Sequence, residues 1–185
     1  MRKLAAFMNV TLNGYFSGAD GDMSWAHAQD EEFNAFVADN ARGGGELLMG
    51  RVTYDMMAAW WPQPAAAQAM PDVAKGMNSM PKWVASRTLK TAAWANSKVL
   101  QGDLEDAVRR LKIASGPDIA ILGSGSIVAQ LAEIGLLDEI QVVVNPVALG
   151  AGRTFLEGVT GRLEFELAAS RTFKNGKVFL RYSPV

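Results

Sequence analysis

The sequence predicts an α/β protein with a mixed, mostly parallel sheet flanked by helices and an antiparallel hairpin at the C-terminus. Short apolar runs of strand length alternate along the chain with segments of helical periodicity. The run over residues 119–122 is apolar throughout, which is typical of a strand covered on both faces. Near the end, Asn175-Gly176 separates two strand-like segments, which indicates a hairpin turn.

The first half of the chain is expected to alternate strands with helices. In order, the expected elements are a strand over 4–12, a helix over 30–41, a strand over 46–49, a helix between Gly50 and Trp60, and a strand over 82–85. In the second of these helices, Val52, Met56 and Ala59 recur at the spacing of one helix face. The segment between Pro64 and Pro81 is rich in Ala, Met and Pro and gives no clear prediction.

The second half predicts the remaining helices and strands. In order, they are a helix with Asp103 as its N-cap, the strand over 119–122, a helix that carries Ile127 and Leu131 and stops at Gly135, a strand over 140–144, and the hairpin around Asn175-Gly176. No internal repeat and no interdomain linker interrupts this order. Residues 1–185 are therefore interpreted as a single domain.

Composition excludes several classes of protein. The 185 residues include 18 Lys and Arg against 19 Asp and Glu, so there is no basic surplus to bind nucleic acid or an anionic membrane. The sequence has no cysteine, and His27 is its one histidine, so we expect no metal centre. No apolar stretch approaches the roughly 20 residues of a spanning helix. We expect a cytoplasmic protein that acts on a small molecule.

Glycine marks two junctions at which a strand is followed by a helix. The first is Gly50-Arg51-Val52-Thr53 and the second is Gly123-Ser124-Gly125-Ser126. A helix N-terminus has unpaired N–H groups and a positive partial charge, and glycine permits a close approach of the backbone and a positive φ. Arg51 adds a guanidinium, and the neighbouring hydroxyl groups add donors. Together the junctions predict an extended dianionic ligand such as a dinucleotide, whereas local turn chemistry explains either one alone.

Two further sites carry polar groups that suit a ligand. Ser86-Arg87-Thr88 follows the strand over 82–85, at the strand end where open α/β sheets bind ligands, and a solvated turn is the alternative. Asp30 lies five residues after Trp25, at the start of a helix. Its carboxylate can anchor an amidine-like heterocycle edge through two hydrogen bonds, or it can simply stabilise the helix N-terminus. Spacing alone favours the second interpretation.

Several motifs together are more specific than any one of them. They are Met49-Gly50-Arg51-Val52-Thr53-Tyr54, Ile121-Leu122-Gly123-Ser124-Gly125-Ser126, Leu136-Leu137-Asp138-Glu139-Ile140 and Asn145-Pro146-Val147-Ala148-Leu149-Gly150-Ala151-Gly152. With the segment over 7–15, they resemble the dihydrofolate reductase-like superfamily. The resemblance is closest to the riboflavin-biosynthesis reductase domain of the bacterial RibD C-terminal type and its stand-alone relatives, and it covers almost the whole chain.

This resemblance implies NADPH as the cofactor. It assigns the cofactor phosphates to Gly50, Arg51 and Thr53, the adenosine 2′-phosphate to Ser86 and Arg87, the pyrophosphate to the turn Gly123-Ser124-Gly125-Ser126, and the nicotinamide carboxamide to backbone groups near Val10 and Ser17. It also implies that Trp25 and Asp30 belong to the substrate site. Asp30 is then the candidate to orient the substrate or relay a proton.

The activity implied is that of an NADPH-dependent reductase. Its substrate would be a small heterocycle or a sugar-linked aminopyrimidine, as in 5-amino-6-(5-phosphoribosylamino)uracil reductase. Reduction of dihydrofolate and binding of NADP(H) without turnover are the alternatives. Ser24 and Ala28 stand where dihydrofolate reductases usually have proline, and Gly123-Ser124 replaces their Gly-Gly, which argues against the first alternative.

The relatives implied by the resemblance are generally dimers. The apolar strand over 142–144 and the long terminal hairpin are candidates to cover a partner's surface. Because an isologous pair is the commonest arrangement of soluble oligomers, we expect a homodimer.

Overall fold

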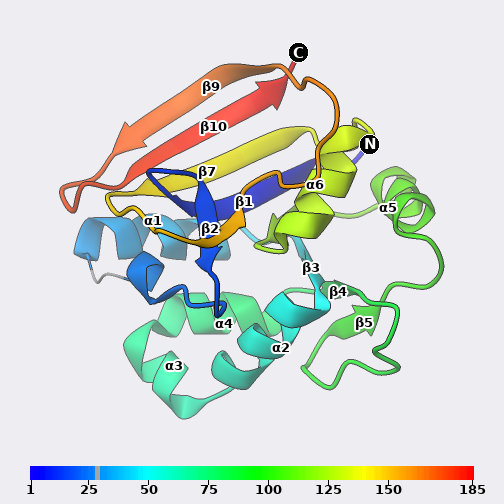
Figure 1. The fold of residues 1–185 in the computed structure, drawn as a ribbon. Helices are drawn as coiled ribbons and strands as arrows, with labels where there is room; N and C mark the ends of the chain where they lie inside the picture. Colours follow the sequence, from blue (N-terminus) through cyan, green and yellow to red (C-terminus); the bar gives the residue numbers. More distant parts are fainter. Residues whose placement is uncertain (28–29) are drawn as a thin grey trace. The chain divides into compact units, whose positions relative to one another are not determined.

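The computed structural model describes every residue except Ala28 and Gln29, so the predicted departure at Ala28 lies outside the described residues. The chain divides into two compact units, both drawn in Figure 1. Unit 1 comprises Met1–Arg2 and Glu31–Leu122, and unit 2 comprises Lys3–Asp30 and Gly123–Val185. That the two units act as one domain stays a prediction.

Unit 1 contains parallel strands and most of the helices. In order across the sheet, its strands are β5 (Ser97–Val99), β4 (Lys82–Ala85), β3 (Glu46–Gly50) and β6 (Ile119–Leu122). Every neighbouring pair is parallel, as the continuous apolar runs predict. The helices are α1 (Glu31–Arg42), α2 (Arg51–Trp60), α3 (Pro64–Ala69), α4 (Pro71–Ser79) and α5 (Leu104–Ile113).

Apolar side chains from α2, α4 and β3 share the core of unit 1. Tyr54 of α2 and Met77 of α4 are buried with Met49 of β3 and with Trp94. Each such side chain contributes about 1.5–3 kcal/mol through burial. The Tyr54 hydroxyl also accepts the backbone N–H of Trp94 at 2.9 Å, which attaches the loop after β4 to α2.

Most of the elements predicted for unit 1 are confirmed, including the Asp103 cap, whose carboxylate accepts two N–H groups of α5. The face predicted from Val52 and Met56 is wrong, because these side chains are 71% and 47% exposed while Tyr54 is buried. Apolar residues stand on two sides of α2, and periodicity alone selects the wrong side. The unassigned segment forms α3 and α4, each with proline in its first turn.

Unit 2 combines a mixed sheet with a short strand pair. In order across the mixed sheet, the strands are β1 (Leu4–Thr11), β7 (Glu139–Asn145), β10 (Val178–Pro184) and β9 (Phe165–Thr172). β1 and β7 are parallel, while β10 is antiparallel to both of its neighbours. β2 (Tyr15–Gly18) pairs with β8 (Gly152–Thr154), and the helical elements are the 3₁₀ turn η1 (Ser24–His27) and α6 (Gly125–Glu133).

The predicted fold class is confirmed: the strands are mostly parallel, helices accompany them, and the chain ends in the antiparallel β9–β10 hairpin (Figure 1). One detail differs, because β7 lies between β1 and β10 and buries Val142 and Val143 in the chain's own core. Val144 of the same strand is partly exposed, and the homodimer stays a prediction. None of the described helices is long and apolar enough to cross a membrane.

Candidate cofactor and substrate sites

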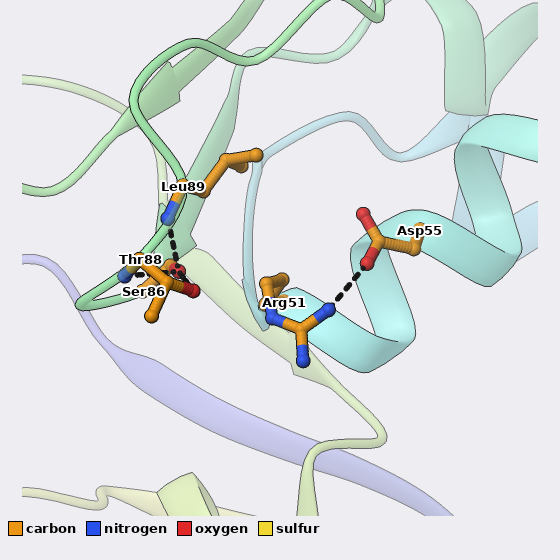
Figure 2. Close-up of polar contacts among 5 residues, drawn as sticks. All are labelled: Arg51, Asp55, Ser86, Thr88 and Leu89. Carbon is orange, nitrogen blue, oxygen red and sulfur yellow. Dashed lines mark hydrogen bonds and ion pairs between the residues drawn. The ribbon is translucent and has the colours of Figure 1, made fainter.

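The register of two neighbouring strands brings the first group of predicted residues together. Gly50, the last residue of β3, pairs with Ala85, the last residue of β4. Arg51 and Ser86 follow directly, so both lie at the carboxyl edge of the parallel strands in unit 1, the edge at which such sheets bind ligands. Figure 2 shows Arg51 at the start of α2 together with Ser86 on the loop after β4.

Intramolecular contacts hold both side chains in place. Arg51 Nη1 donates to Asp55 Oδ2 at 3.0 Å, one turn along α2, and both side chains are about half exposed. Ser86 Oγ accepts the N–H groups of Thr88 at 3.2 Å and Leu89 at 3.0 Å, which shapes the loop (Figure 2). A guanidinium has more N–H groups than this ion pair uses, and the serine hydroxyl can still donate. The chemistry of the set suits an anion.

The remaining predicted residues of this junction differ in their surroundings. Gly50 is the N-cap of α2 and adopts φ −77° and ψ 164°, a conformation open to any residue, so the conformational freedom of glycine is not used here. Thr53 is partly buried in the first turn of α2, and Arg87 is exposed on the loop after β4. This junction therefore offers charge and hydroxyl donors rather than an unusual backbone.

The second junction, in unit 2, has the unusual backbone. Gly123 adopts φ 54°, a left-handed value that glycine permits, and Ser124 adopts φ 59° and ψ 54°. Such left-handed geometry is costly for any residue with a side chain. Ser124 is the N-cap of α6, and its carbonyl accepts the N–H groups of Ile127 at 2.8 Å and Val128 at 3.1 Å.

Packing explains the second glycine of this turn. A Cβ atom built on Gly125 would lie 2.4 Å from Cε1 and 2.7 Å from Cζ of Phe16, the β2 residue that packs against it. The sequence interpretation attributed this glycine to the approach of a ligand, but the aromatic ring already requires it. Ser126 follows in the first turn of α6 with its side chain exposed.

The two backbone positions predicted to hold the carboxamide are both buried. Val10 lies near the end of β1, and its carbonyl accepts Asn145 Nδ2 at 3.1 Å. Ser17 pairs with Arg153 across β2 and β8, and a Cβ on Gly152 would come within 2.1 Å of the Ser17 carbonyl oxygen. Asn145 itself begins one of the motifs quoted from the sequence, but sequence reasoning gave it no role of its own. Its Oδ1 is buried and has no hydrogen-bond partner within the described part of the chain.

Trp25 and Asp30 lie in the segment that leads into α1. Asp22 precedes η1 and caps it, with Ser24 donating both its N–H and its hydroxyl to the Asp22 carboxylate at 3.0 Å. The backbone N–H of Ser24 is the main reason that the pKa of Asp22 is lowered. The Trp25 indole donates to the Asp22 carbonyl at 3.3 Å, and Asp30 is partly buried immediately before α1.

A buried lysine that sequence reasoning missed faces this segment. Lys177, in the turn between β9 and β10, is 1% exposed, and its Nζ donates to the Ala26 carbonyl at 2.7 Å. Burial lowers the pKa of Lys177, while the Asp30 carboxylate acts in the opposite direction. The sequence shows a polar residue after a hairpin turn, for which exposure is the normal expectation.

Metal-ligand groups and surface depressions complete the description of the candidate sites. No group of three or more acidic, histidine or cysteine side chains that could hold a metal ion occurs among the described residues. An open depression of about 510 Å³ lies in unit 1, next to the residues that contact Arg51 and Ser86. Its lining includes Asp55 and Leu89, the partners of Arg51 and Ser86, together with Tyr54 and Trp94.

The mixed, mostly parallel strands with their helices and antiparallel C-terminal hairpin define an α/β protein, and the solved structures that share this fold place it in the dihydrofolate reductase-like class. Within that class, the chain belongs to the RibD C-terminal domain family, whose model matches residues 2–179. A curated relative, the uncharacterized protein YyaP of Bacillus subtilis (strain 168), is 27% identical over 186 residues, covering 98% of this chain and 94% of YyaP.

Solved structures share the fold. A putative riboflavin biosynthesis protein from Shewanella sp. PV-4 superposes with a TM-score of 0.75 at 22% identity, over 99% of both chains. A pyrimidine reductase-like protein from Corynebacterium diphtheriae gives 0.66 at 14% identity, over 100% of this chain and 92% of the other. A Thermotoga maritima diaminohydroxyphosphoribosylaminopyrimidine deaminase/5-amino-6-(5-phosphoribosylamino)uracil reductase gives 0.73 at 13% identity, over 100% of this chain and 57% of that protein.

Proposed function

We propose that this protein is an NADPH-dependent reductase of a sugar-linked aminopyrimidine or a related small heterocycle. The observation that carries the proposal is the pairing of Gly50 with Ala85, which gathers a helix N-terminus, the Arg51 guanidinium and the Ser86 hydroxyl at one strand edge. Membership of a reductase-type domain family supports it, as does the open depression beside these donors, because a nucleotide needs room for its base next to its phosphate.

In this proposal the residues that hold NADPH fall into two groups. Arg51, Thr53, Ser86 and Arg87 of unit 1 bind phosphate oxygens, together with the N–H groups at the start of α2. The turn over 123–126 and backbone groups near Val10 and Ser17 form the second group. When bound, NADPH supplies the hydride, and the protein contributes orientation, electrostatics and exclusion of water.

Trp25 and Asp30 form the substrate side of the proposal. The Asp30 carboxylate accepts two N–H groups of a heterocycle edge and fixes the plane of the ring, and Trp25 covers the ring. Asp30 also holds or relays a proton at the reduced atom. Dihydrofolate carries an edge of the same kind. Separate assays with the aminopyrimidine and with dihydrofolate therefore distinguish the two activities.

Titration with NADPH and with NADH, followed by nicotinamide fluorescence, tests the cofactor. Oxidation of NADPH with 5-amino-6-(5-phosphoribosylamino)uracil and, separately, with dihydrofolate then tests the substrate. We expect Asp30→Asn to lower turnover by about 100-fold or more, as loss of a general acid–base group does, with cofactor affinity nearly kept. Unchanged turnover removes Asp30 from the site, and NADPH binding without oxidation of any substrate identifies a non-catalytic binder.

A further inference from the structure

The turn that joins β9 and β10 buries an amino group next to the candidate substrate site. Lys177 is 1% exposed, and its Nζ donates to the carbonyl oxygen of Ala26 at 2.7 Å. Ala26 belongs to η1, the turn that also carries Trp25. A side chain at the end of the terminal hairpin therefore holds a backbone group next to Trp25, although about 150 residues separate the two in sequence.

Asp30 provides the negative charge that acts on this ammonium. Burial lowers the pKa of Lys177, and the Asp30 carboxylate raises it, so the two charges stabilise each other. A buried charge that is neither paired nor hydrogen-bonded is costly. Lys177 thus depends on the Ala26 carbonyl, to which it donates directly, and on the charge of Asp30, which acts on it electrostatically.

The turn itself is shaped to deliver this side chain. Asn175 Oδ1 accepts the N–H of Lys177 at 3.1 Å, and the Lys177 carbonyl accepts the N–H of Phe173 at 2.9 Å. Gly176 adopts φ 84° and lies so close to Pro146 that a Cβ would meet its Cγ at 3.3 Å. These contacts within the turn set the direction of Lys177 in addition to its bond to η1.

A second buried lysine shows what a purely local role looks like. Lys82 in unit 1 is also 1% exposed and donates to a backbone carbonyl, that of Met80, at 2.6 Å. Its ammonium lies 4.4 Å from the centre of the Trp94 ring, and burial lowers its pKa to about 8. These contacts of Lys82 all lie within unit 1, whereas Lys177 donates to the residue directly after Trp25 and is acted on by the charge of Asp30.

We propose that Lys177 is a positioning residue of the substrate site: its ammonium fixes η1 through the Ala26 carbonyl and serves as the counter-charge of Asp30. The identification of this region as a substrate site rests on the proposed function. The coupling of Lys177 to η1 and to Asp30 is independent of that function. In this role Lys177 acts through Trp25 and Asp30. Loss of its charge should displace these residues and leave the cofactor groups of unit 1 unchanged.

The test compares Lys177→Met with Lys82→Met, a control of equal burial and the same carbonyl bond. The readouts are the NMR resonances of the Trp25 indole N–H and the His27 amide, the NADPH affinity, and kcat and KM with 5-amino-6-(5-phosphoribosylamino)uracil. We expect Lys177→Met to shift both resonances and to lower kcat by about 10- to 100-fold, the usual effect of a misplaced catalytic group. Lys82→Met should leave the resonances and kcat nearly unchanged. NADPH affinity should change less than about twofold in both variants, because neither lysine is one of the residues predicted to bind phosphate.

Two further variants keep the proposal falsifiable. Lys177→Arg retains the charge and donors and should restore part of the lost kcat. If Lys177→Met does not fold, Asp30→Asn replaces it, and the Lys177 Cε resonance should then titrate at lower pH than in the parent protein. Unmoved Trp25 and His27 signals, equal shifts in the Lys82 control, or an unchanged Lys177 titration would each overturn the proposal. If the parent protein shows no turnover, the proposed function is refuted. The NMR results then still decide whether Lys177 positions η1 and Asp30.

Discussion

The two glycine-marked junctions look alike in sequence and differ in structure. At Gly50-Arg51, the backbone is ordinary, the helix starts at once, and the distinctive group is a half-exposed guanidinium bound to Asp55. At Gly123-Ser124-Gly125, there is no charged side chain, and the distinctive features are two left-handed residues and a glycine pressed against Phe16. One junction contributes charge and the other contributes shape.

The difference shows that glycine can occur at similar positions for different physical reasons. Gly50 needs no special φ, Gly123 has a positive φ, and Gly125 leaves room for an aromatic ring. A ligand explanation is therefore strongest where donors converge, at Arg51 and Ser86, and weakest at Gly125. Substitutions at the two junctions should separate ligand affinity from stability.

The largest effect is expected at Gly125. Gly125→Ala places a methyl group 2.4 Å from the Phe16 ring and should lower the free energy of unfolding by about 1–3 kcal/mol, the usual range for overpacking. Chemical denaturation measures it. Gly150→Ala is the control, since no atom of the described residues beyond its chain neighbours lies within 4 Å of a Cβ there. If Gly125→Ala keeps full stability but loses NADPH binding, the glycine serves the ligand and the packing explanation is wrong.

A smaller effect, on affinity rather than stability, is expected at Arg51. Arg51→Ala should weaken NADPH about 10- to 50-fold through loss of a charge-assisted hydrogen bond. Stability should change by less than about 0.5 kcal/mol, because the ion pair with Asp55 is half exposed. A larger loss for NADPH than for NADH assigns Arg51 to the 2′-phosphate, and equal losses assign it to the pyrophosphate.

Asp55→Asn is the matched control for this comparison. It keeps Arg51 and removes its internal partner, so NADPH affinity should be equal or slightly higher. Unchanged affinity in Arg51→Ala would mean that the guanidinium serves only its ion pair within α2, and the charge-against-shape contrast between the junctions would lose its functional meaning.

Sequence reasoning predicted what depends on local patterns. The Asn175-Gly176 turn, the Asp103 cap and the apolar strand β6 follow from turn chemistry, capping and burial, and all are confirmed. The buried face of α2 was wrong because Val52 and Met56 have the same spacing as a true core stripe. Only the packing partners of Tyr54 decide between the two faces.

The site could be predicted in part for the same reason. Arg51 and Ser86 could be placed at one strand edge, because parallel strands bring their carboxyl ends together. Lys177 could not be placed beside Ala26, since the contact joins distant segments and a lysine after a turn normally faces water. The sequence Gly-Ser-Gly alone does not indicate that Gly123 and Ser124 adopt the left-handed conformation and Gly125 does not.

The smallest effect is expected at Ser124, where the shape of the second junction can be kept while its strain is removed. Ser124→Gly should raise the free energy of unfolding by about 0.5–1 kcal/mol, because glycine adopts φ 59° without the steric cost that a side chain brings. The greater entropy of glycine in the unfolded chain reduces this gain. Paired denaturation curves measure the change. The control is Ser126→Gly in the first turn of α6, which should instead destabilise the protein by about the same amount because glycine has a lower helix propensity than serine. A destabilised Ser124→Gly variant would mean that the serine side chain makes a contact worth more than the strain, and the junction would then contribute chemistry as well as shape.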